Sequence, residues 1–132
     1  MRMLMKRWVK YHAPAVFWAV LVFTVSSLPK LKSPSLGIPF SDKIFHGSEY
    51  LVLSMLTLRS LAASRGLNGR TVLLAMAVCT VFGILDELHQ SFVPGRDCNA
   101  GDMLADIAGS ALGILFCGRH LAVRRRSVPN DS

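Results

Sequence analysis

Ionisable side chains gather at the borders of apolar runs, where they could do chemistry. The segment 83–113 reads GILDELHQSFVPGRDCNAGDMLADIAGSALG and holds five of the chain's eight acidic residues. A second group, Asp42, His46 and Glu49, stands at the start of another apolar run. Because charged groups are costly in apolar segments and usually mark function there, these two stretches are the candidate site.

Carboxylates and imidazoles suit two kinds of chemistry, proton transfer and metal binding. The metal-ligand types are His46, Glu49, Glu87 and His89, and a His-x-x-Glu spacing can work on a helix. The sequence shows no Gly-x-Ser-x-Gly and no phosphate-binding glycine loop. We therefore predict no cofactor, although a divalent metal is compatible with these residues. The sequence leaves open whether the protein is an enzyme.

Four apolar runs must position these side chains, at residues 13–28, 44–63, 71–85 and 103–117. The first spans only about 24 Å and needs residues 8–12 to cross a core of about 30 Å. A soluble bundle is the alternative, but it would need charged faces along the first and third runs, which have none. The sequence predicts an all-α integral membrane bundle of four transmembrane helices.

Local signals refine the expected helices. Ser41 or Asp42 is a natural N-cap, and Pro14 is tolerated in a first helical turn. Gly109 and Gly113 form a G-x-x-x-G pair, which we expect to pack within the monomer. The short loop around Pro94 should make the third and fourth helices antiparallel neighbours.

Basic residues are distributed unequally between the two sides of such a bundle. With four crossings, ten lie on the side of the termini and four on the other, namely Lys30, Lys32, Lys43 and Arg96. The positive-inside rule then places both termini in the cytoplasm and the protein in the inner membrane. Residues 1–12 and 118–132 become basic cytoplasmic ends of a membrane domain at 13–117. Topology and anionic lipid explain these ends, so no nucleic-acid partner is predicted.

The same topology brings the polar residues to the outer leaflet. Asp42, His46 and Glu49 share one helical stripe, and Asp102 and Asp106 share another with the two glycines. The predicted outer pocket comprises Asp42, Lys43, His46, Glu49, Tyr50, Asp86, Glu87, Gln90, Arg96, Asp102 and Asp106. A purely structural interpretation competes, in which Asp42 and Asp102 cap helices and Asp86 pairs with Arg96 or Lys43.

Two blocks carry a family resemblance. The first is Asp42-Lys43-x-x-His46-x-x-x-Tyr50. The second is Asp86-Glu87-x-x-Gln90-x-Phe92-x-Pro94-Gly95-Arg96, with Asp102 beyond it. In these blocks and its four apolar runs the chain resembles the VanZ-like family of small bacterial membrane proteins over about residues 13–117. It departs from the family at Gly47, where an aromatic residue is usual, and at Asp106, where asparagine is usual.

The resemblance implies a cell-envelope protein linked to susceptibility to the glycopeptide antibiotic teicoplanin. In this interpretation the outer pocket binds a lipid headgroup, a cell-wall precursor or the antibiotic. The alternative is a membrane-embedded enzyme that uses its carboxylates and histidines, with or without a metal, on a lipid-linked envelope substrate.

Overall fold

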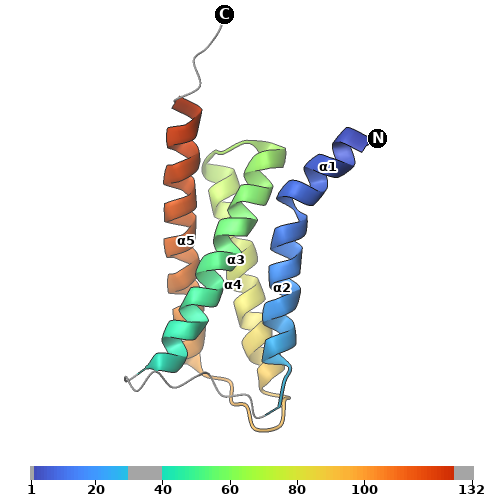
Figure 1. Ribbon diagram of the computed structural model, residues 1–132. Coiled ribbons are helices and arrows are strands. Elements are labelled where there is room, and N and C mark those ends of the chain that lie inside the picture. The colour runs from blue at the N-terminus through green and yellow to red at the C-terminus, as the bar shows by residue number, and fades with distance from the viewer. Residues whose placement is uncertain (1, 30–39, 127–132) are drawn as a thin grey trace, which may run out of the picture.

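A bundle of long helices forms the molecule. The computed structural model describes residues 2–29 and 40–126, so Lys30, Lys32 and the end of the predicted cytoplasmic tail lie outside it. The described part is all-α, with helices α1 (Arg2–Tyr11), α2 (Ala13–Ser26), α3 (Ser41–Arg65), α4 (Gly69–Gln90) and α5 (Ala100–Arg126). In Figure 1, α2 to α5 run side by side and α1 leans away at one end. The predicted all-α class is confirmed for the described residues.

Helix α2 covers most of the first apolar run, but the longer predicted span, which adds residues 8–12 to that run, is not one continuous helix. Two helices replace it, and the chain bends by 43° between Met5–Tyr11 and Ala13–Ser26. Pro14 stands at the start of α2, as expected. Proline cannot donate a backbone hydrogen bond, and its ring clashes with the carbonyl four residues earlier, which explains a break at this point.

The other helix ends differ from the sequence-based bounds in detail. Neither Ser41 nor Asp42 is the N-cap of α3, because that position falls on Phe40, which has a left-handed backbone with φ of 63°. Asn68 caps α4 by accepting a hydrogen bond from the backbone N–H of Thr71 at 2.9 Å. Helix α5 continues past residue 117 to Arg126, through residues such as Leu, Ala and Arg that favour helices.

Helices long and apolar enough to cross a membrane are present. Two of them, α4 and α5, meet both conditions, and the bent pair α1–α2 makes a third if it counts as one span. Helix α3 is long but carries several charged residues, including Lys43, Glu49 and Arg59. Length and composition thus account for two spans, or up to three, and four crossings remain a prediction.

Small residues allow α3 and α5 to pack closely. A Cβ atom on Gly109 would overlap the carbonyl oxygen of Gly47, and one on Gly113 would overlap the carbonyl oxygen of Leu51. The G-x-x-x-G pair therefore packs within the monomer, as expected. Its close contact brings the start of α5 against the start of α3, where the polar residues lie.

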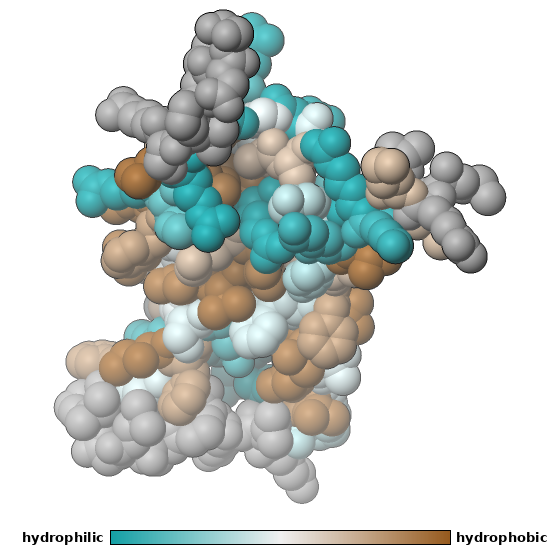
Figure 2. Space-filling model, turned by 45° about the horizontal axis from the view of Figure 1, so that its top comes forward, coloured by the Kyte–Doolittle hydropathy of each residue, from teal (hydrophilic) through white to brown (hydrophobic). Residues whose placement is uncertain are grey.

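The surface combines apolar sides with a polar end. Large apolar side chains are exposed along the bundle, with Phe17 at 68%, Leu73 at 71% and Phe116 at 62% exposure. Figure 2 shows hydrophilic residues gathered toward the end where α1 and the last turns of α5 lie. Basic side chains from these helices and α3 line a cavity of about 480 Å³ there. This end is opposite to the one that holds the candidate site.

Candidate functional site

Three helix ends meet at the candidate site. The first turns of α3 and α5 and the last turns of α4 lie together at the lower end of the bundle in Figure 1. Antiparallel packing of α3 with α4 and of α4 with α5 produces this arrangement. The two motif blocks, far apart in the sequence, are therefore neighbours in space.

Six of the sequence-predicted residues form a buried group, which we call the polar cluster. Each is at most 8% exposed, and Tyr50 and Glu87 are fully buried. Its members are His46, Tyr50, Asp86, Glu87, Gln90 and Asp106. Burial of several carboxylates is costly unless they are paired or neutralised, so the cluster needs a compensating charge or ligand.

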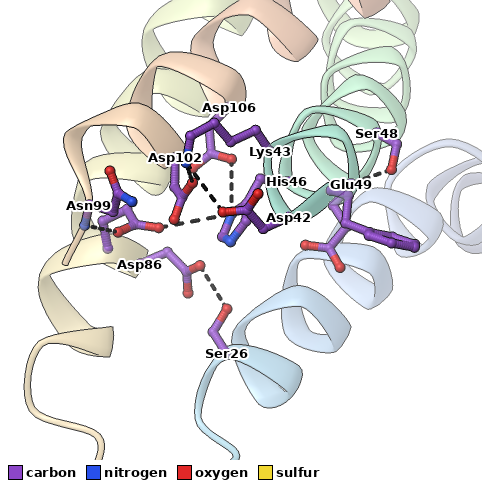
Figure 3. A network of polar contacts seen from close by, with 12 residues as sticks. Ser26, Asp42, Lys43, His46, Ser48, Glu49, Asp86, Asn99, Asp102 and Asp106 are labelled. Carbon is purple, nitrogen blue, oxygen red and sulfur yellow. Dashed lines mark hydrogen bonds and ion pairs between the residues drawn. The ribbon is translucent and has the colours of Figure 1, made fainter. Parts of the chain in front are cut away.

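His46 and two carboxylates occupy the centre of the polar cluster. The Nδ1 atom of His46 lies 3.4 Å from Asp106 Oδ1 and 3.9 Å from Glu87 Oε1. One ligand atom from each of the three residues lies within 4.8 Å of the others. The second oxygen of Glu87 accepts a hydrogen bond from the backbone N–H of Asn99 at 3.1 Å, which orients its carboxylate. Figure 3 shows Asp106 pointing from α5 toward His46 on α3.

Asp86 is held from the α2 side. Its Oδ2 atom accepts hydrogen bonds from the hydroxyl of Ser26 at 2.7 Å and from the amide of Gln90 at 3.1 Å. The Ser26 contact is visible in Figure 3. The purely structural interpretation predicted that Asp86 pairs with Arg96 or Lys43. The structure shows Ser26 and Gln90 as its partners instead.

Lys43 lies at the edge of the polar cluster, between two further carboxylates. Its Nζ atom lies 2.8 Å from Asp102 and 3.3 Å from Asp42. Lys43 precedes the apolar run of α3, and the hydrogen bond with Asp102 raises its pKa. Asp102 thus links α5 to α3 through a side-chain ion pair, and a helix-capping role does not describe it.

A glycine on α4 makes room for the polar cluster. A Cβ atom on Gly83 would lie 3.2 Å from the Tyr50 ring and 3.4 Å from the Asp106 side chain. The first of these contacts is tighter than most Cβ contacts, so the Tyr50 ring would have to shift by a few tenths of an ångström. Gly83 thus lets α4 approach these two side chains while both remain fully or almost fully buried.

Several buried polar atoms at the site have no hydrogen-bond partner. They are His46 Nδ1, Tyr50 Oη, Asp86 Oδ1, Glu87 Oε1, Arg96 Nε, both Asp106 oxygens and Ser110 Oγ. Buried polar groups are usually paired, and an unpaired one costs about 1–3 kcal/mol. They come from α3, α4, α5 and the loop between α4 and α5, all at one end of the bundle.

Besides Asp42, Lys43 and Asp102, three predicted residues lie outside the polar cluster. His89 contacts Ser27 at 3.0 Å and stacks on Phe23, so it faces α2 and does not join His46. Glu49 is half-buried, and Figure 3 shows its carboxylate directed toward α2. Among the described residues Arg96 has no ion pair, and it donates to the backbone carbonyl of Val25 at 3.2 Å. Of the four predicted metal ligands, only His46 and Glu87 come together, and Asp106 completes the group.

Sequence reasoning missed three contributors to the site. Ser26 and the backbone of Asn99 hold two of the buried carboxylates, and Ser110 lies on the same α5 face as Asp106. Ser110 could have been found, because it is four residues beyond Asp106 on the stripe with the glycines. Nothing in the local sequence pairs Ser26 with Asp86, 60 positions away.

Comparison with protein families gives one match that covers nearly the whole chain. Residues 3–121 match VanZ/LLP1. The chain belongs to the VanZ/LLP1 family. Comparison with curated proteins and with solved structures gives no match. Family membership and the apolar helices together make this VanZ/LLP1 protein a helical membrane protein, as the resemblance implied.

Proposed function

We propose that this VanZ/LLP1 protein crosses the cytoplasmic membrane four times and keeps both termini in the cytoplasm. Helix α3 lies alongside α5 in Figure 1, and its polar residues His46 and Tyr50 are buried between helices instead of facing lipid. Charged groups in membrane segments usually face the bundle interior in this way. The basic end of the molecule would then face the cytoplasm, in keeping with the positive-inside rule.

We further propose that the polar cluster binds the polar head of an envelope molecule and thereby alters glycopeptide susceptibility. One observation carries this proposal: buried polar atoms without partners converge from three helices at the end expected to face outward. A folding network would pair its members, because each unpaired buried group lowers stability. A site awaiting a ligand keeps them unpaired.

The unpaired atoms indicate which chemistry the ligand offers. Oxygens of Asp86, Glu87 and Asp106 are acceptors when the acids are ionised, so the ligand should present O–H or N–H donors. Lipid headgroups with sugars or amines, lipid-linked cell-wall precursors and teicoplanin-type glycopeptides all share this chemistry. A ligand without hydrogen-bond donors would not fit.

Susceptibility testing of paired variants examines the proposal. Expression of the wild type in a susceptible host should raise the inhibitory concentration of teicoplanin. Asp86→Asn should abolish the increase, because it weakens the acceptor set, whereas Asp97→Asn, at an exposed loop position, should retain it. No effect of the wild type, or equal loss in both variants at equal membrane levels, would contradict the proposed function.

A second candidate function is a membrane enzyme that acts on a lipid-linked envelope substrate. The grouping of His46, Glu87 and Asp106 favours it, because an imidazole between two carboxylates can move protons. Conversion of a lipid-linked precursor by purified protein, lost in His46→Ala, would establish this function in place of simple binding.

A further inference from the structure

The centre of the polar cluster has the composition of a metal site. His46, Glu87 and Asp106 offer one nitrogen and two carboxylate groups, and all three side chains are buried. An imidazole nitrogen together with carboxylates suits divalent transition metals such as zinc and manganese better than magnesium or calcium. Suitable side chains alone do not make a metal site. The distances between their ligand atoms must also fit an ion, and those atoms must be free of other hydrogen bonds.

The distances between the three side chains fit a small ion. Zinc binds nitrogen and oxygen at about 2.0–2.2 Å, which places two ligands of a tetrahedral ion about 3.3–3.6 Å apart. The Nδ1 atom of His46 is 3.4 Å from Asp106 Oδ1 and 3.9 Å from Glu87 Oε1. Small side-chain rotations would bring the second distance into range.

The ligand atoms are also the atoms that lack partners. His46 Nδ1, Glu87 Oε1 and Asp106 Oδ1 are all buried without a hydrogen bond. The other Glu87 oxygen is already held by the backbone N–H of Asn99, as outer partners commonly orient metal ligands. The unpaired atoms are therefore those that point at one another.

Charge supports the same conclusion. Two ionised carboxylates in a buried site carry a charge of about −2 that a divalent cation would cancel, which offsets the cost of burying them. Among the residues that the structure describes, His46 lies within ion-pair distance of both Glu87 and Asp106, and no lysine or arginine does. A single charged imidazole would offset only half of that charge. By the family resemblance, asparagine is usual at the position of Asp106. The aspartate here adds the second carboxylate of the group.

We infer that His46, Glu87 and Asp106 bind one divalent transition-metal ion of the zinc type. Three protein ligands leave a coordination position open, which is typical of catalytic and ligand-binding sites. The inference rests on the proposed function and refines it: the ion would take Glu87 Oε1 and Asp106 Oδ1, and hydrogen-bond donors of the ligand would meet Asp86 Oδ1 and Asp106 Oδ2. Such an ion would also strengthen the enzymatic candidate, because it can polarise a bound group or activate water.

Titration of the purified full-length protein tests the inference. After chelator treatment, zinc added in isothermal titration calorimetry should bind at one ion per chain. Cobalt, as a spectroscopic substitute, should give visible absorption of a nitrogen-ligated ion. Glu87→Gln and Asp106→Asn should each weaken binding at least tenfold, since even the loss of an outer partner costs about 10–100-fold. Glu49→Gln, the matched acid outside the group, should bind like the wild type.

The wild-type titration decides the inference even if a variant does not fold, and circular dichroism will identify such a variant. No stoichiometric zinc binding by the wild type would overturn it. Unchanged affinity in folded Glu87→Gln and Asp106→Asn would overturn it too. The measurement uses no envelope ligand, so its failure is separate from a failure of the susceptibility test.

Discussion

At the scale of single residues, burial without pairing separates the polar cluster from an ordinary network. Asp86 combines both conditions, because Ser26 and Gln90 both donate to one of its oxygens. Its other oxygen is unpaired, so this carboxylate is anchored on one side and open on the other. That combination is expected of a residue positioned for a ligand.

Replacement of Ser26 tests this anchoring. Ser26→Ala removes the 2.7 Å hydrogen bond and leaves a buried carboxylate oxygen with one partner fewer. We expect the free energy of unfolding in detergent to fall by about 1–3 kcal/mol. Ser48→Ala serves as the control, because the exposed Ser48 hydroxyl donates only to the nearby carbonyl of Phe45 and its loss should change stability by less than about 0.5 kcal/mol. Equal effects of the two variants would show that Asp86 does not depend on Ser26.

Sequence spacing predicted part of this residue-scale picture. The polar residues of α3, α4 and α5 could be assigned to one end of the bundle, because each group borders an apolar run. The sequence could not predict which carboxylates lie beside His46. His46 and Glu49 are three residues apart on α3, yet α2 covers the Glu49 side, where Trp18 donates to its carbonyl, while Asp106 on α5 faces His46. Helical periodicity gives the stripe but does not say which neighbouring helix covers it.

At the scale of helices, the α3–α5 contact determines where the site forms. Gly47, Gly109 and Gly113 allow the backbones to approach, and this approach brings Asp102 to Lys43 and Asp106 to His46. The same approach leaves no room for a Cβ atom on Gly109 or Gly113.

Alanine substitution at the helix contact tests this dependence. Gly109→Ala would place a methyl group on the carbonyl of Gly47, so the helices must separate. We expect a loss of about 1–3 kcal/mol in unfolding free energy, as for other overpacked contacts. Gly69→Ala at the start of α4 has open space around its Cβ and should be neutral or slightly stabilising. Thermal unfolding of both variants in detergent provides the comparison, and a neutral Gly109→Ala would show that close packing is not required.

The helix boundaries show where sequence reasoning reaches its limit. The four apolar runs predicted α2, α3, α4 and α5 near their observed positions. The break at His12 was not predicted, because a first-turn proline is compatible both with a continuing span and with a new helix. The N-cap of α3 is Phe40, which has a left-handed backbone. The sequence contains no signal that predicts this conformation.

At the scale of the whole molecule, charge is divided between the two ends. Every described acid lies on the first turns of α3 and α5, the last turns of α4 or the loop after it. Basic residues of α1, α3 and α5 line the cavity at the opposite end. Because the two ends differ in charge, the bundle should insert into the membrane in one orientation. The proposed function requires the acidic end to face outward.

Labelling of Cys98 in intact cells tests this orientation most directly. Cys98 is exposed in the loop between α4 and α5, beside the polar cluster, whereas Cys79 and Cys117 are buried. A membrane-impermeant thiol reagent should therefore label the wild type from outside, and Cys98→Ser should remain unlabelled. Labelling of the wild type only after the cells are permeabilised would place the polar cluster on the cytoplasmic side and contradict the proposed outer-leaflet site.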